Sequence, residues 1–140
     1  MATRSAIALA HQDGTVEAIY CHWDGYVDCN GRILDECYQD RSKVQELIDL
    51  GDLSALNDTI AECEAYSRDR GEKYDMVVAR RYGSYQMMIE DELEDSDREY
   101  LYVFLKNDTW AVISKHDYNR GAHKLTDAIA ELNRSKLHAV

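Results

Sequence analysis

The stretch "TRSAIALAHQDGTVEAIYCHW", from Thr3 to Trp23, contains two segments of strand-forming residues that meet at Asp13-Gly14. Asp-Gly favours a two-residue type I′ turn, because both central residues of that turn need a positive φ. We therefore predict a β-hairpin over residues 3–23. Alternation in its second strand puts His22 on the face of Val16 and Tyr20, and Trp23 on the face of Ile19. Trp23 is expected to be buried, and His22 to be a hydrogen-bonded core residue.

A second stretch, "EYLYVFLKNDTWAVIS" (99–114), predicts another hairpin over about 99–115, with its turn at Asn107-Asp108. Its strands are apolar on both faces, which predicts a central position in the sheet. Helical spacing appears at about 32–38, from the cap Asp40 to Gly51, at 82–94 and at 122–137. The patterns at 59–66 and 76–79 are weak strand signals, and the structure of 57–98 is left open. The sequence predicts one α+β domain over 1–140, with an antiparallel sheet, a middle helical segment and a C-terminal helix.

Composition narrows the class of function. The chain has 140 residues, with 16 Lys and Arg against 27 Asp and Glu, for a net charge of −11. Such a charge disfavours direct binding to nucleic acid or to an anionic membrane. No apolar run approaches the ~18 residues of a membrane span, and the first residues lack the length of a secretory signal. We expect a cytoplasmic protein whose four cysteines stay reduced. The composition also allows the protein to form a homo-oligomer.

The segment "IYCHWDGYVDCNG" (19–31) concentrates reactive side chains at the end of the first hairpin. A metal-dependent or thiol enzyme could use Cys21, His22 or Asp24, with ligands such as Cys63 or His116 added from elsewhere. Neighbours in a strand point to opposite faces, so Cys21 and His22 cannot easily form a dyad. We predict no catalytic residue, metal or cofactor. The corner is structural first, with Asp24 and Tyr26 exposed enough to touch a partner.

Two charged clusters supply the remaining candidates. "EDELEDSDRE" (90–99) holds seven carboxylates in ten positions, and it could imitate a phosphate backbone or dock on a basic groove of a protein. The residues predicted to bind a partner are Asp24, Tyr26, Glu90, Asp91, Glu92, Glu94, Asp95 and Asp97. The alternative is a binder or sponge for a cyclic-nucleotide signal. Its anion site would use Arg68, Arg70, Lys73 and Arg80, with Trp23, Tyr26 or Tyr66 stacking on a base.

The segments "RSAIALAHQDGTVEAIYCHWDGY", "VQELIDLGDLSAL" and "RDRGE" resemble a family of small uncharacterised proteins from bacteriophages and prophages. The likeness covers the first half, through Glu72, and is most specific at His22-Trp23-Asp24-Gly25-Tyr26. In that family a proline and a glycine-rich turn often follow the tyrosine, whereas Val27, Asp28 and Cys29 stand here. The resemblance implies a phage origin and carries over no catalytic residue.

Together, these features predict a non-enzymatic, acidic phage accessory protein that works in the cytoplasm of the infected bacterium. Its partner is predicted to be a host protein with a basic surface, which it binds and inhibits. Host defence machinery, such as a CRISPR or restriction nuclease, and host transcription machinery are the expected targets. The charge, the abundance of tyrosine and the missing catalytic signature motivate this hypothesis.

Overall fold

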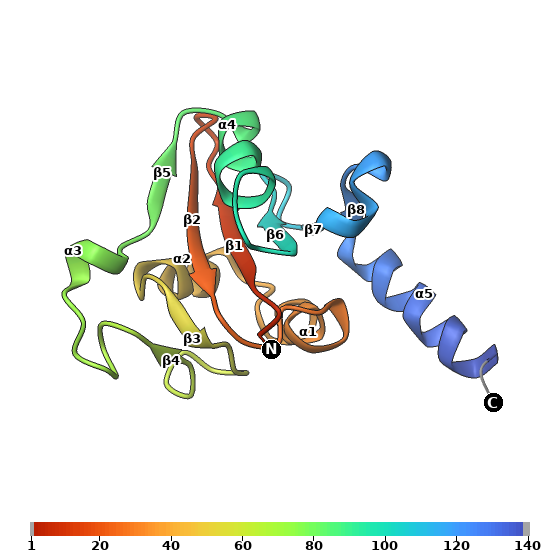
Figure 1. Cartoon of the computed structure of the whole chain (residues 1–140), viewed down its shortest axis with the longest axis horizontal. Coiled ribbons are helices and arrows are strands. Elements are labelled where there is room, and N and C mark those ends of the chain that lie inside the picture. Colours follow the sequence, from red (N-terminus) through yellow and green to blue (C-terminus); the bar gives the residue numbers. More distant parts are fainter. Residues whose placement is uncertain (1, 139–140) are drawn as a thin grey trace.

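A mixed sheet of eight strands forms the centre of the molecule, with helices on both of its faces (Figure 1). The computed structural model describes residues 2–138, except for the side chains of 118–120 and 138. The strands are β1 (Ser5–Ala10), β2 (Val16–Cys21), β3 (Leu53–Ala55), β4 (Glu64–Ala65), β5 (Arg80–Tyr82), β6 (Tyr100–Phe104), β7 (Trp110–Ser114) and β8 (His123–Lys124). The helical segments are η1 (Val27–Gly31), α1 (Arg32–Cys37), α2 (Arg41–Asp49), α3 (Tyr74–Val77), α4 (Tyr85–Ile89), η2 (Glu90–Glu94), η3 (Lys115–Arg120) and α5 (Leu125–His138).

The α+β class and both predicted hairpins are confirmed, but the sheet is not purely antiparallel. Strands follow the order β4-β3-β2-β1-β6-β7-β8, and β5 pairs with β2. The central pair, β1 and β6, is parallel from Ser5↔Tyr100 to Leu9↔Phe104, and β2 and β3 are also parallel at Cys21↔Leu53. The two hairpins lie side by side with their first strands adjacent and running the same way, so the strands between them pair in parallel.

The two hairpin loops have the same construction, which differs from the predicted two-residue turn. In the first, the His11 N–H donates to Thr15 O (2.9 Å) and the Gly14 N–H to His11 O (3.1 Å). In the second, the Leu105 N–H donates to Thr109 O (2.8 Å) and the Asp108 N–H to Leu105 O (3.0 Å). Each is a three-residue loop in which only the last residue has a positive φ, +92° at Gly14 and +63° at Asp108.

Arg41, the first residue of α2, holds the two loops together. Its guanidinium donates to Ala10 O (2.9 Å) at the end of β1, to Leu105 O (2.6 Å) after β6 and to the Asp108 carboxylate (2.8 Å). It also lies over the Phe104 ring, 5.2 Å from its centre. One side chain therefore ties both hairpins to the helix between them.

We expect Arg41→Ala to lower the free energy of unfolding by about 2 kcal/mol, because it removes charge-assisted hydrogen bonds to two partly buried carbonyls. Arg41→Lys should recover only part of the loss, since an ammonium group lacks the fork that reaches three acceptors. Urea denaturation measures both. The matched control is Arg81→Ala, an exposed arginine with one bond to Thr15 Oγ1 at 3.2 Å, which should change stability by less than about 0.5 kcal/mol. Equal losses at Arg41 and Arg81 would contradict this role.

The central strands of the sheet are buried on both faces, each face against a different set of helices. One face carries the large side chains Tyr102, Phe104 and Trp110 and is covered by α1, α2 and α5. The other carries small side chains, including Ala6, Ala8, Ala10 and Ala18, and packs against Met88 and Leu93 of the α4–η2 segment. The alanines let this helical segment approach the sheet closely. All six residues of β1 are buried as a result.

In the middle of the chain, the predicted helices are present but the predicted strands are mostly not. The helices predicted at 32–38 and 40–51 are α1 and α2, with Asp40 capping the Ser42 N–H and Gly51 at φ +80°. The helix predicted at 82–94 is present as α4 and η2. The strand signal at 59–66 is confined to β4, and the one at 76–79 is wrong, because helix α3 occupies 74–77. In the part of the chain that the structure describes, no helix is long and apolar enough to cross a membrane.

Candidate functional site

The corner after β2 is held by backbone and side-chain hydrogen bonds, two of them to distant parts of the chain and two from Asn30 within the corner itself. The Gly25 N–H donates to Thr3 O (2.9 Å), and Gly25 O accepts the buried Tyr102 hydroxyl (2.6 Å). Asn30 adds its N–H to Asp24 O (3.0 Å) and its side-chain amide to Trp23 O (3.0 Å). A Cβ on Gly25 would lie 2.8 Å from Thr3 O, so only glycine fits there. The chain direction at this corner is therefore fixed both by Asn30 within it and by Thr3 and Tyr102 from outside it.

The structure corrects the predicted burial of Trp23. Strand β2 ends at Cys21, two residues earlier than expected, and the Trp23 side chain is 45% exposed. Its indole packs edge-on against the ring of His22, which is half-buried and bonded through Nδ1 to the Tyr20 hydroxyl (2.7 Å). Because the indole is largely exposed, Trp23→Ala should destabilise the fold less than the loss of a buried tryptophan would. Asp24, at φ +61°, and Tyr26 are exposed, as predicted.

Both thiols of the corner have pKa values raised above the ordinary value of cysteine. Burial raises the pKa of Cys21 to about 12, against a weaker opposing effect of its hydrogen bond from Asn30. Burial, together with the charges of Asp24 and Asp28, also raises the pKa of Cys29. Nucleophilic cysteines need a lowered pKa, which cationic neighbours supply. All four cysteines are free in the described chain, where no group of three potential metal ligands is found either.

The acidic cluster at 90–97 lies on η2 and in the loop after it, at the sheet face lined with alanines. Glu90, Asp91, Asp95 and Asp97 are exposed and Glu94 is half-buried, which agrees with a surface role. Glu92 is the exception, because it is fully buried. Its prediction as a partner-binding residue is wrong: its carboxylate points into the protein, where it meets Arg80.

The Arg80 guanidinium lies between two carboxylates. It bonds Glu92 through Nε and Nη2, both at 2.8 Å, and Asp52 through Nη1 at 3.1 Å. Burial acts to lower the pKa of Arg80, but the bonds and charges of Glu92 and Asp52 outweigh it and raise that pKa. For Asp52 burial prevails over the attraction of Arg80, and its pKa is raised. Glu92 is thus the main partner of Arg80, with the shorter, two-pronged contact.

The other arginines proposed for an anion site also have partners inside the fold. Arg68 donates to the backbone oxygens of Ile60 (3.0 Å) and Cys63 (2.6 Å) and pairs with Asp69. Arg70 pairs with Glu64 at 2.6 Å and lies over the Tyr66 ring. Lys73 is exposed. An incoming phosphate would have to displace these contacts, so the structure does not assemble the predicted anion site.

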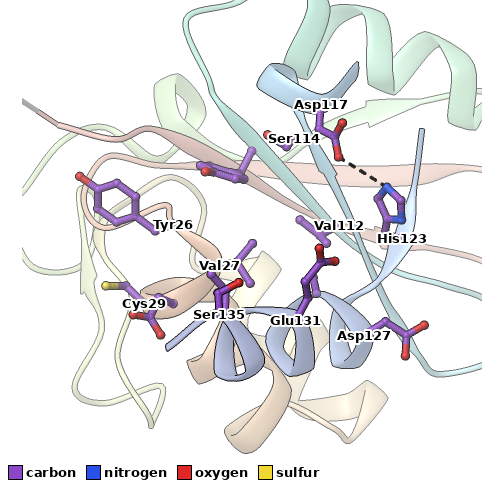
Figure 2. Close-up of a pocket in the computed structure, with 14 residues that line it drawn as sticks. Tyr26, Val27, Cys29, Val112, Ser114, Asp117, His123, Asp127, Glu131 and Ser135 are labelled. Atoms are coloured by element: carbon purple, nitrogen blue, oxygen red, sulfur yellow. Dashed lines mark ion pairs between the residues drawn. The ribbon is translucent and has the colours of Figure 1, made fainter. Parts of the chain in front are cut away.

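A groove that was not predicted from the sequence lies between α5 and the sheet, with a volume of about 640 Å³ (Figure 2). One wall is α5, the other is the turn Tyr26–Cys29, and the floor comes from β6 and β7. The residues that line it are Tyr26, Val27, Asp28, Cys29, Tyr100, Val112, Ser114, Asp117, His123, Asp127, Ala128, Glu131, Leu132 and Ser135. Tyr26 is the one predicted partner-binding residue among them.

The two walls of the groove are joined by an ion-pair network. Asp28 of η1 binds Arg32 of α1 (2.6 Å) and Lys136 of α5 (2.9 Å). The hydrogen bonds from Arg32 and Lys136 lower the pKa of Asp28. Arg32 also donates to the side chain of Asn133 on α5 at 2.6 Å. These contacts fix the C-terminal half of α5 against the turn that forms the opposite wall.

Comparisons with known proteins identify no relative. No protein-family model, no curated protein and no solved structure matches the chain. Function is therefore inferred from the residues and their arrangement.

Proposed function

We propose that this chain is a non-enzymatic binding protein that docks on a basic surface of a host protein. It does so with its acidic η2 surface, which Glu90, Asp91, Glu94 and Asp95 form. In the phage setting that the sequence resemblance suggests, such docking inhibits the partner. A nuclease of a defence system, or transcription machinery, is the proposed target, because both expose basic grooves that normally hold nucleic acid. A rigid acidic surface occupies such a groove in place of phosphates.

The observation that carries the proposal is a set of four carboxylates with no basic partner. Among the residues that the structure describes, no lysine, arginine or histidine forms an ion pair with Glu90, Asp91, Glu94 or Asp95. Most arginines, by contrast, are used in internal pairs. Four of the protein's unpaired carboxylates are therefore gathered within six consecutive positions, where a partner can reach them.

The backbone under these carboxylates is well anchored. Leu93 and Glu92 are fully buried, and Glu92 is held by Arg80 of β5. The Asp95 N–H closes the turn onto Glu90 O at 2.8 Å, and the Ser96 hydroxyl donates to Glu92 O at 2.9 Å. A fixed array of charges loses little conformational entropy on binding, which favours a specific contact.

The test compares two triple variants with the same change in net charge. The first is Glu90→Gln, Glu94→Gln and Asp95→Asn. The control is Glu36→Gln, Glu46→Gln and Asp75→Asn, at exposed positions that have no ion pair within the described chain. Proteins captured from host lysate are identified by mass spectrometry, and the affinity of the purified partner is measured at several salt concentrations.

We expect wild type and control to bind a basic partner with an affinity that falls steeply with salt, because exposed charges are screened. The first variant should bind at least about tenfold more weakly, since three charge-assisted contacts are lost at roughly 1 kcal/mol or more each. Equal affinity of the two triple variants, or binding that high salt leaves unchanged, would refute the proposal.

A further inference from the structure

The α5 wall of the groove carries an ordered row of polar groups. Asp127, Glu131 and Ser135 are spaced four residues apart, so they lie along one side of the helix. Ala128 and Leu132 line the groove beside them, and Val112 contributes to its floor. In Figure 2 the Glu131 side chain extends from α5 toward the strands. The groove is thus apolar at its base, with carboxylates on its helical wall.

Two of the groove's carboxylates are free to bind a cation. Asp28 is already paired with Arg32 and Lys136, and Asp117 lies 3.9 Å from His123. Asp127 and Glu131 are exposed and form no ion pair with any described residue. The unbalanced charge of the groove therefore lies on α5, one helical turn apart.

Aromatic rings face the same space. Tyr26 is 45% exposed at one end of the groove, and Tyr100 is half-buried and stacked on Tyr102 with ring centres 6.4 Å apart. An aromatic face attracts a cation, most strongly where a carboxylate can pair with it at the same time. A planar guanidinium can make both contacts at once, because it stacks on an aromatic ring and donates two parallel hydrogen bonds to a carboxylate.

We propose that this groove binds an arginine side chain presented by a segment of the basic partner protein. Glu131 pairs with the guanidinium, Tyr100 lies beside it, and Val112 and Leu132 contact the aliphatic stem. Tyr26 and Asp127 lie at the two ends of the groove (Figure 2). The partner's identity rests on the proposed function, whereas the groove's preference for arginine does not. A volume of about 640 Å³ lies within the roughly 300–1,000 Å³ of ordinary ligand sites, enough for the side chain and its neighbours.

The test uses a blocked tetrapeptide, acetyl-Ala-Arg-Leu-Ala-amide, and two analogues in which lysine or neutral citrulline replaces arginine. Each is titrated into the isotopically labelled full chain and followed by amide NMR shifts. We expect saturable shifts at 26–29 and 127–135, in the order arginine, lysine, citrulline. Glu131→Gln should weaken the arginine peptide about tenfold, the factor that corresponds to one charge-assisted bond. The control, Glu46→Gln on α2, should change nothing.

Several outcomes would overturn the groove proposal. They are equal binding of the citrulline peptide, equal weakening by Glu46→Gln, shifts confined to 90–95, or no saturation. Tighter binding of spermidine than of the arginine peptide would assign the groove to a free polycation instead. If Glu131→Gln keeps full affinity for the purified partner while the triple variant at Glu90, Glu94 and Asp95 loses it, the groove proposal fails and the proposed function stands.

Discussion

Replacing Tyr102 with alanine is expected to lower the free energy of unfolding by about 3–5 kcal/mol, the usual cost of removing a large aromatic side chain from a core. Tyr102 lies on the central strand β6, is fully buried and stacks on Tyr100. Its hydroxyl donates to Gly25 O at 2.6 Å, so the substitution also leaves a buried carbonyl without its donor. Denaturant unfolding followed by circular dichroism measures the effect.

The control Tyr102→Phe separates these two contributions. It keeps the ring and removes only the hydroxyl, so it should cost about 1–3 kcal/mol, the penalty for an unsatisfied buried acceptor. The NMR shifts of the Asp24–Tyr26 amides should change in this variant, because the corner loses its link to β6. If Tyr102→Phe were neutral and left those shifts unchanged, the bond to Gly25 would have no part in holding the corner.

Arg80→Ala is expected to cost a similar amount, about 3–5 kcal/mol, because it leaves the buried Glu92 carboxylate uncompensated. Arg70→Ala is the matched control, since its pair with Glu64 is exposed on both sides and such pairs contribute about 0–1 kcal/mol. The loss in free energy of unfolding of each variant is obtained from the midpoint and slope of its urea denaturation curve. Similar losses at Arg70 and Arg80 would mean that Glu92 is solvated.

The double variant Arg80→Ala with Glu92→Gln tests the cause of the loss. Glu92→Gln removes the buried carboxylate that Arg80→Ala leaves without a counter-charge. The double variant should therefore be more stable than Arg80→Ala alone. Strict additivity of the two single losses would instead show that the two side chains stabilise the fold independently. The comparison also bears on the η2 surface, because Glu92 anchors the turn that carries Glu90 and Asp95.

Features that depend on neighbours in sequence were predictable. The hairpins follow from alternation and turn residues, and α2 from its cap Asp40 and the glycine at 51. The three-residue loops were missed because Asp13-Gly14 fits two loop types. The Asp13 carboxylate accepts hydrogen bonds from the Thr15 N–H and hydroxyl, which favours the longer loop. In the second hairpin, the Thr109 hydroxyl donates in the same way to the Asn107 side chain.

Features that depend on distant partners were not predictable from local pattern. Glu92 has the same chemistry as Glu90, but Glu92 is buried with Arg80 and Tyr82 of β5 as its partners, whereas Glu90 is exposed. The alternating sequence pattern continues to Trp23, but strand β2 ends two residues earlier. The groove forms where α5 meets a turn about a hundred residues before it. Its one sequence signal is the four-residue spacing of Asp127, Glu131 and Ser135.

The parallel pairing of β1 with β6 also governs how the chain acquires its structure during synthesis. The loops at Gln12 and Lys106, joined in the final fold, are 94 residues apart in the chain. The first hairpin leaves the ribosome long before β6 is translated, so the outer edge of β1 stays open meanwhile. That edge, "SAIALA", has no charge to prevent pairing with another nascent chain. Pairing across such a separation slows folding. We therefore expect the protein to depend on chaperones when it is produced rapidly.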